Sequence, residues 1–237
     1  MEKVIYLLWR DPQVSVERWG DQLRGELARQ LLELGVRGLQ LNIADAAVAP
    51  AAPLVQVATR PQMAAFAQVW VSSAVDTLRQ PVDDIIRAAS ARTAAYLVCE
   101  SQPIVNTRHP PVPPQRTAGF SQIAVLKRPP RLSHEAWLEA WQNQHTPVAV
   151  ETQDNFEYTQ NLVVRPLSYD APAYSGIVEE CFETAAMTDP RVFFDAVDDE
   201  EKFNRHLGRM MESCDRFIDR GRIDVVQTSQ YVISAPH

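Results

Sequence analysis

The sequence predicts an α+β fold made of two tandem ferredoxin-like β-α-β-β-α-β modules that pack sheet to sheet. Three observations support this prediction: an internal repeat, the same order of strand and helix patterns in both halves, and strands that are apolar on both faces. A chain of 237 residues has room for two domains of roughly 110 to 120 residues each. Hydrophobic residues make up 46% of the chain, which is enough for a substantial core.

The internal repeat divides the chain into two halves. Residues 5–19 (IYLLWRDPQVSVERW) align with residues 123–137 (IAVLKRPPRLSHEAW) at a constant offset, since 123 − 5 = 118. Seven of these fifteen aligned positions are identical. Self-similarity at one fixed offset indicates a duplicated structural unit.

The first module, residues 1–100, shows strand and helix patterns in the order expected for this unit. Strands are expected at residues 4–9, 39–43, 54–59 and 94–100. Ser15 is a good N-cap for the first helix, whose apolar stripe continues to Leu34. A second helical stretch is expected between residues 61 and 90, with an interruption near Pro81.

The second module, residues 119–237, repeats the same order. Strands are expected at residues 123–127, 156–164, 175–182 and 223–233, and helices at 133–153, near 190–196 and around 203–217. Residues 101–118 separate the modules and contain the run His109-Pro-Pro-Val-Pro-Pro. Because such a run favours extended backbone and cannot continue a helix, this segment is expected to be a linker.

Several strands are apolar on both faces, among them the first strand of each module and the segments 54–58 and 94–98. A sheet that has helices on one side needs a different cover for its second face. The other module of the same chain is the nearest available cover. The two sheets are therefore expected to close on each other and to leave a cavity between them.

Composition and motifs exclude several classes of function. A net charge of −7 without a basic stripe argues against a nucleic-acid partner, and no run approaches the roughly 20 apolar residues of a membrane span. Three scattered cysteines without a CxxC pair favour a reducing, cytoplasmic location. The absence of HExxH, G-x-G-x-x-G and G-x-S-x-G motifs predicts no metal, no other cofactor and no nucleophilic serine.

A set of motifs in the second half carries a family resemblance. Strand 123–127 ends in Lys-Arg, the following helix holds Trp141-Gln-Asn-Gln-His145-Thr-Pro147, and the next strand holds Tyr158-Thr-Gln-Asn161. This stretch resembles the EthD family of the dimeric α+β barrel superfamily. The resemblance implies that the chain forms internally, as an intramolecular dimeric α/β barrel, what family members usually build from two chains. In the first half, Leu23 and Leu27 stand at the positions of Trp141 and His145, so that module is expected to be a degenerate copy.

His145 is the candidate catalytic residue. It follows Trp137 and Trp141 at four-residue spacing, which places all three on one helix face. Thr146-Pro147 is expected to kink or end the helix directly after His145. A helix C-terminus favours the charged imidazolium and an apolar setting favours the neutral ring, so His145 is expected to titrate near neutrality as a general acid or base. The alternative is a partly buried histidine that only packs.

Three residues are candidates for substrate binding: Trp141, Tyr158 and Gln160. Tyr158 and Gln160 alternate on one face of the expected strand 156–164, where the hydroxyl of Tyr158 is placed to orient a substrate oxygen. The alternative for Tyr158 is an ordinary aromatic residue in a sheet.

Three functions remain open from the sequence. The first is a cofactor-independent enzyme of proton-transfer, isomerase, cyclase or monooxygenase type that acts on a small, hydrophobic, oxygenated molecule in the cavity between the sheets. The second is a non-catalytic ligand-binding or accessory protein with the same fold, and the third is a haem-binding protein with His145 as the iron ligand. The expected partner is a small hydrophobic molecule, and a homodimer of the whole chain is expected on general grounds.

Overall fold

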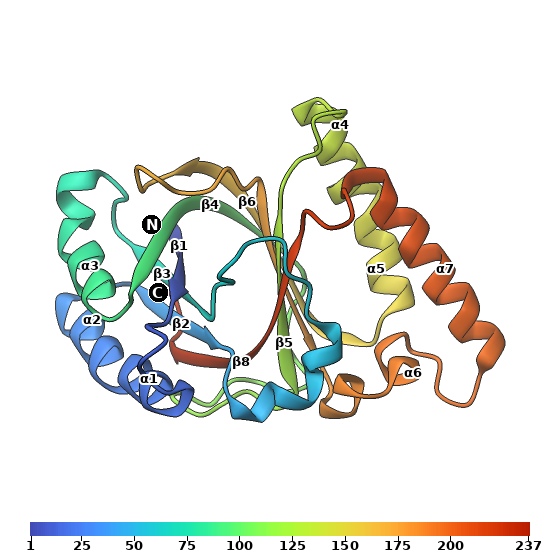
Figure 1. The fold of residues 1–237 in the computed structure, drawn as a ribbon, viewed down its shortest axis with the longest axis horizontal. Helices are drawn as coiled ribbons and strands as arrows, with labels where there is room; N and C mark the ends of the chain where they lie inside the picture. The colour runs from blue at the N-terminus through green and yellow to red at the C-terminus, as the bar shows by residue number, and fades with distance from the viewer.

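The computed structural model describes residues 1–237 as an α+β fold around one closed, eight-stranded barrel (Figure 1). All neighbouring strands are antiparallel, in the order β1-β3-β2-β8-β5-β7-β6-β4. The strands are β1 Glu2–Trp9, β2 Gly38–Ile43, β3 Ala65–Val71, β4 Arg92–Ile104, β5 Phe120–Leu126, β6 Asn155–Pro166, β7 Gly176–Phe182 and β8 Asp224–Ser234.

Helices cover two opposite sides of the barrel (Figure 1). Those of the first half are α1 Val16–Gln22, η1 Leu23–Leu27, α2 Ala28–Leu34, η2 Ala46–Leu54 and α3 Asp76–Ala88. Those of the second half are α4 His134–Leu138, η3 Glu139–His145, α5 Thr146–Thr152, η4 Thr184–Met187, α6 Pro190–Phe193 and α7 Glu200–Phe217. No helix has both the length and the apolar character needed to cross a membrane.

The two halves share one continuous barrel rather than forming two separate stacked sheets. Strands of the first half follow the order β4-β1-β3-β2, and those of the second half follow β8-β5-β7-β6. Hydrogen-bonded pairing of β2 with β8 and of β4 with β6 joins the halves at both seams. The closed barrel agrees with the barrel expected from the sequence, and hydrogen-bonded pairing across the seams, which was not predicted, satisfies the edge strands of both halves.

The third strand of the first half lies at β3, Ala65–Val71, and not at residues 54–59 as expected. Its sequence AFAQVWV is rich in residues that suit a strand buried on both faces. Leu54 instead ends the short helix η2, and of residues 55–59 only Gln56 makes a bridge, to Val225. Helix α3 starts at Asp76 and contains Pro81, and strand β4 runs to Ile104, past the expected end at residue 100.

The first helix of each half is continuous and contains one π-helical turn. In the second half it runs from His134 to Thr152, so Pro147 does not end it as expected. The π-helical turn η3 lies directly before the proline, and such a turn changes the hydrogen-bond register where proline cannot donate. Turn η1 of the first half ends at Leu27, the equivalent position, since 145 − 27 = 118.

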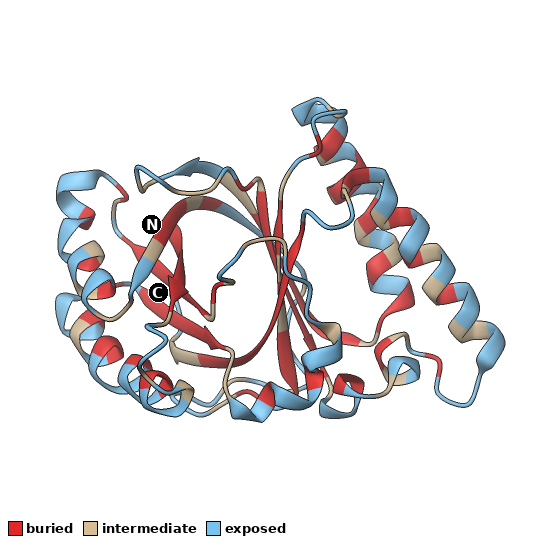
Figure 2. Ribbon diagram, viewed as in Figure 1, coloured by how far each residue is buried: buried red, intermediate tan, exposed pale blue.

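The barrel strands consist largely of buried residues (Figure 2), and side chains from both halves fill the interior. At one end, Ile5 and Leu7 of β1 belong to the same apolar cluster as Ile123 of β5 and Ile177 of β7. Because β1 is a barrel neighbour of neither β5 nor β7, these contacts span the interior. The inner faces of the two halves therefore bury each other, as predicted.

The other end of the interior is polar and centres on Glu179, which is 2% exposed. Its carboxylate accepts hydrogen bonds of 2.6 to 3.0 Å from five side chains. The donors are Gln40, Asn42, Gln68, Ser121 and Gln230. These bonds satisfy a charge that would otherwise be costly to bury.

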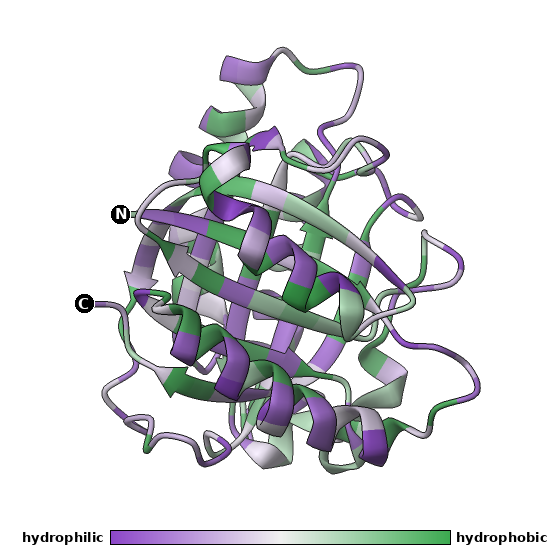
Figure 3. Cartoon of the chain, turned by 90° about the vertical axis from the view of Figure 1, so that its left-hand side faces the viewer, coloured by the Kyte–Doolittle hydropathy of each residue, from purple (hydrophilic) through white to green (hydrophobic).

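The outer face of each half packs against its own helices. On the first-half side, shown in Figure 3, hydrophobic and hydrophilic residues alternate along the helices that cover the sheet. Leu23 and Leu27 belong to the packed core on this side, together with Val4, Tyr6 and Leu8 of β1. The positions equivalent to Trp141 and His145 thus serve packing in the first half.

Candidate functional site

A pocket of about 440 Å³ lies between the outer face of the second-half sheet and the helices η3, α6 and α7. Fifteen of its 24 lining residues are hydrophobic, so the pocket suits a small, largely apolar molecule. This position corrects the expected cavity between the sheets. The interior of the barrel is occupied by the apolar cluster and by the hydrogen bonds of Glu179, so the pocket forms on the helix side instead.

The first half contributes to this pocket through the end of η2 and the segment that follows it. Pro53, Leu54 and Gln56 line it beside residues of β5 and β8. Two backbone hydrogen bonds, 3.1 and 2.9 Å long, join Gln56 to Val225 of β8 and hold this segment in place. The pocket therefore needs both halves of the chain.

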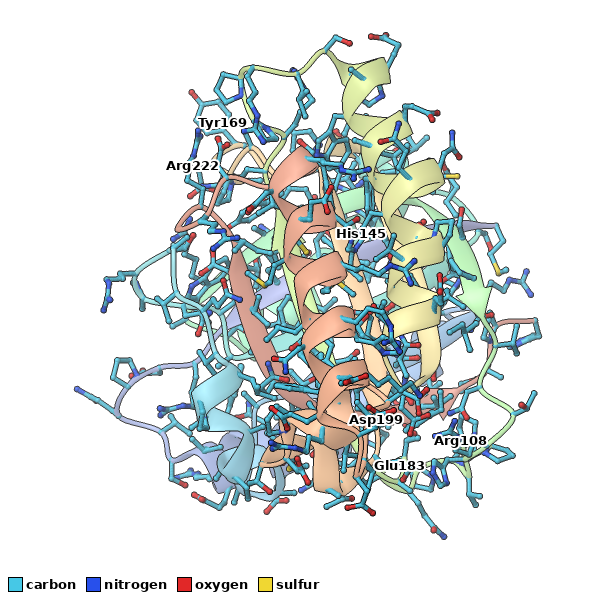
Figure 4. The ribbon with its side chains drawn as sticks, turned by 90° about the vertical axis from the view of Figure 1, so that its right-hand side faces the viewer. Arg108, His145, Tyr169, Glu183, Asp199 and Arg222 are labelled. Atoms are coloured by element: carbon cyan, nitrogen blue, oxygen red, sulfur yellow. The ribbon has the colours of Figure 1, made fainter.

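His145 lies between α5 and α7 and lines the pocket (Figure 4). Its Nδ1 is 3.0 Å from the hydroxyl oxygen of Ser213, and its ring centre is 4.7 Å from that of Phe217. Burial lowers the pKa of His145 to about 4, so the ring is neutral at pH 7. The expected opposing effect of a helix C-terminus is missing, because the helix continues to Thr152.

Tyr158 also lines the pocket, and Gln160 lies beside it on the same face of β6. The Nε2 of Gln160 donates to the Tyr158 hydroxyl at 2.8 Å and to the Thr146 hydroxyl at 2.7 Å. Burial raises the pKa of Tyr158, so its hydroxyl stays protonated. Tyr158 and Trp141 line the pocket. Gln160 does not line it, but its side chain bonds to the Tyr158 hydroxyl and orients it.

Trp141 is completely buried, and its indole N–H has no hydrogen-bond acceptor. The ring packs against Trp137 with 4.8 Å between ring centres and closes over Gly176 of β7. A Cβ atom at residue 176 would lie 2.7 Å from the Trp141 ring, so only glycine leaves room for it. An unpaired buried donor is unusual in a folded protein.

Glu180 is the functional residue that sequence reasoning missed. It lines the pocket from β7, is 8% exposed and lies opposite Tyr158 on β6. Its carboxylate accepts a hydrogen bond of 3.1 Å from Nδ2 of Asn155. Burial raises the pKa of Glu180 to about 7, so the group exchanges a proton near neutral pH. The available signal was a pair of adjacent glutamates within the apolar strand IVEECF.

The pocket thus contains a carboxyl group that titrates near neutral pH, a neutral imidazole and a protonated phenol, all in apolar surroundings. Such surroundings strengthen electrostatic interactions with a bound molecule and exclude water. Proton transfer to or from a bound carbon or oxygen acid is the chemistry that these groups support.

A second acidic cluster lies inside the barrel and has a different character. Ligand atoms of Glu157, Glu179 and Cys181 lie within 4.8 Å of one another, all in buried side chains. Burial and the neighbouring Glu179 raise the pKa of Glu157 to about 7. Because five side chains already donate to the Glu179 carboxylate, few of its lone pairs remain to bind a metal ion.

Fold and pocket together define an α+β barrel protein with a small-molecule pocket beneath its second-half helices. Within this barrel, residues 129–221 match the model of the EthD domain, which confirms the resemblance predicted from the sequence. This part of the chain includes most of the helices and strands that form the pocket. A search of curated proteins finds no match.

Solved structures share the fold at very low sequence identity. An anthrone oxidase-like protein aligns with a TM-score of 0.57 and 9% identity over 100% of this chain and 94% of its own. A protein of Fusobacterium nucleatum provisionally named a monooxygenase has a TM-score of 0.48, 9% identity and coverages of 98% and 92%. A dye-decolorizing peroxidase of Bacteroides thetaiotaomicron also reaches 0.48, with 8% identity and coverages of 97% and 93%. The first of these similarities supports the α+β barrel fold.

Proposed function

We propose that this chain is a cofactor-independent enzyme that removes a proton from a small, hydrophobic, oxygenated molecule, with Glu180 as the general base. The observation that carries the proposal is a buried carboxyl group in an apolar pocket beside a protonated tyrosine and a neutral histidine. The name of the anthrone oxidase-like structure suggests anthrone as a probe molecule.

The first step is a proton transfer that conserves charge. The Glu180 carboxylate takes a proton from an acidic C–H, and the electron pair of that bond moves to the carbonyl oxygen to form an enolate. Return of the proton to another carbon would complete an isomerisation. In a monooxygenase-type reaction, dissolved O₂ would oxidise the enolate, so that a CH₂ group becomes C=O and the second oxygen atom leaves as water.

His145 has a supporting role in this proposal. With its Nδ1 beside the Ser213 hydroxyl, its Nε2 is the ring nitrogen left to interact with a ligand. If Nδ1 carries the hydrogen, Nε2 offers a lone pair; if Ser213 donates to Nδ1, Nε2 carries an N–H. Both forms are neutral, so His145 can donate a hydrogen bond to a ligand oxygen or accept one from a ligand hydroxyl without adding charge to the pocket.

We also propose that the two halves are duplicated ferredoxin-like modules, of which the first has lost its pocket residues. The equivalent strand orders, β4-β1-β3-β2 and β8-β5-β7-β6, support this proposal, as do the π-helical turns at equivalent positions. Leu23 and Leu27 stand where the second half has Trp141 and His145, and this replacement would convert a pocket of the first half into packed core.

The test is hydrogen–deuterium exchange of anthrone, followed by mass spectrometry in D₂O, with O₂ uptake measured in parallel. The wild-type chain should accelerate exchange above the buffer rate, and Glu180→Gln should reduce the acceleration by about 100-fold or more. Glu201→Gln, an exposed glutamate in the first turn of α7, is the matched control and should retain the full rate.

Equal rates for the wild type and Glu180→Gln would refute Glu180 as the base. Binding of anthrone without any acceleration by the wild-type chain would refute the enzyme and favour the ligand-binding alternative, which the largely hydrophobic lining also suits.

A further inference from the structure

The mouth of the pocket differs in character from its interior. Most lining residues are hydrophobic, but three polar ones, Gln56, Asp215 and Arg220, are exposed, so they lie where the pocket meets solvent. Arg220 is the only lysine or arginine among the 24 residues of the lining. The lining also contains two carboxyl groups, that of Asp215 and that of the buried Glu180. A single cation therefore stands at the opening of a largely apolar pocket.

Asp215 orients the guanidinium group of Arg220. Asp215 lies in the last turn of α7, and Arg220 lies in the turn that follows this helix, two residues before Arg222 in Figure 4. The Nε and Nη2 atoms of Arg220 donate to the two carboxylate oxygens of Asp215, each at 2.7 Å. This bidentate pair holds the planar guanidinium by one of its edges.

Arg220 keeps hydrogen-bonding capacity for a ligand. A guanidinium has five N–H groups, and in Arg220 only two of them have an acceptor within the protein. The other three lie on Nη1 and Nη2, along a second edge of the group. That edge matches the two oxygens of a carboxylate. Because the side chain is 64% exposed, a ligand can reach this edge without displacing Asp215.

We propose that the pocket takes an amphipathic molecule, with an apolar aromatic body inside the pocket and a carboxylate bound to the free edge of Arg220 at the mouth. The binding of this molecule rests on the lining of the pocket and on Arg220. Its reaction rests on the proposed function of Glu180 as the base. Arg220 is thus a residue that determines specificity, and it takes no part in the proton transfer.

The mouth and the base belong to one continuous lining. Burial is the main cause that raises the pKa of the Cys214 thiol to about 12, the charges of Glu180 and Asp215 raise it further, and that of Arg220 lowers it. Cys214 is itself part of the lining, within the electrostatic reach of both the base and the cation. One small aromatic molecule in this pocket can therefore contact Glu180 and Arg220 together.

The subsite can be tested with 2-naphthoate and 2-naphthamide, which share a bicyclic apolar body and differ in charge. The measurement is the dissociation constant of each compound for the full chain at pH 6, by titration calorimetry. At this pH 2-naphthoate is ionised, whereas Glu180, whose pKa burial raises to about 7, is largely protonated and does not repel it. The wild type should bind 2-naphthoate about fivefold more tightly than 2-naphthamide, as expected for an ion pair partly open to water.

Three variants sharpen this experiment. Arg220→Gln should remove the preference, because glutamine is polar but lacks the positive charge. Asp215→Asn should increase it, because one negative charge beside the bound carboxylate is lost. Arg216→Gln is the matched control, since this exposed arginine of α7 pairs with Glu212 outside the pocket and its loss changes the net charge equally. No preference in the wild type, or an equal loss in Arg216→Gln and Arg220→Gln, would overturn the subsite.

A second comparison separates this subsite from the proposed reaction. Anthrone-2-carboxylate combines the acidic carbon of anthrone with a carboxylate group. At low substrate concentration the wild type should accelerate its deuterium exchange more than that of anthrone, and Arg220→Gln should remove the difference. Equal acceleration of both compounds by the wild type would overturn the subsite and leave the proposed reaction standing. Acceleration of neither would overturn the reaction, while an Arg220-dependent preference for 2-naphthoate would still establish the subsite.

Discussion

Replacing Glu180 by Gln should make the folded chain more stable at alkaline pH. The carboxyl group is 8% exposed, and burial raises its pKa to about 7 from an ordinary value of 4.5. At pH 8 the group is ionised, although its surroundings favour the neutral form. Glutamine has the same shape, keeps an oxygen that accepts from Asn155, and is neutral at every pH.

The magnitude follows from the shift in pKa. Since 7 − 4.5 = 2.5 units and each unit corresponds to about 1.4 kcal/mol, the linked free energy is about 3 kcal/mol. A raised carboxyl pKa means that this stability is fully present below pH 4.5 and is lost as pH rises through 7. The difference in unfolding free energy, Glu180→Gln minus wild type, should therefore grow from near zero at pH 4.5 to about 3 kcal/mol at pH 8.

The assay is urea denaturation of both proteins at several pH values between 4.5 and 8. The unfolding free energy of the wild type alone combines two opposite effects of pH. His145 has a lowered pKa of about 4, so its contribution to stability is lost as pH falls below 6.5. The difference between the two proteins removes this contribution, since both contain His145. A difference that stays constant with pH, or a glutamine variant that is less stable at pH 8, would show that Glu180 is not a strained carboxylate.

Three further predictions follow from the same geometry. The rate of anthrone exchange should rise with pH with a midpoint of about 7, as Glu180 ionises, and a flat profile from pH 5 to 9 would contradict its role as the base. Gly176→Ala should destabilise the chain by about 1 to 3 kcal/mol in thermal unfolding, because its Cβ would lie too close to the Trp141 ring. Glu179→Ala should cost about 3 kcal/mol or more in urea denaturation, because it removes an acceptor shared by five buried side chains; a loss below 1 kcal/mol would show that this carboxylate is not a structural centre.

Much of the fold could be predicted because the same pattern of strands and helices occurs in both halves of the chain. Ser15 and Ser133 both cap the first helix of their half, and the apolar stripe after each serine continues as expected. The strand at 54–59 was wrong because the apolar run at 54–58 is typical of a strand buried on both faces, although in the structure only Gln56 makes a bridge. An apolar run describes the composition of a segment, whereas pairing depends on neighbours that are distant in sequence.

The position of the pocket was harder to predict than some of the residues that line it. Alternation on β6 correctly placed Tyr158 and Gln160 on one face, but every residue from 155 to 161 is buried, so the pattern does not tell which face looks toward the helices. The pKa of His145 was mispredicted because Pro147 suggested a helix end, and the π-helical turn before it allows the helix to continue. Glu180 could not be picked out from the sequence because adjacent glutamates in an apolar strand face opposite sides, and only the structure shows that Glu180 lines the pocket while Glu179 lies inside the barrel.

Direct titration of the Glu180 carboxyl group tests the central claim about this pocket. The full chain can be labelled with ¹³C at glutamate side-chain carboxyls, and the Glu180 resonance can be assigned by its absence in Glu180→Gln. The pocket geometry predicts a midpoint of about 7 for this resonance. A midpoint near 4.5, like that of an exposed glutamate, would contradict it.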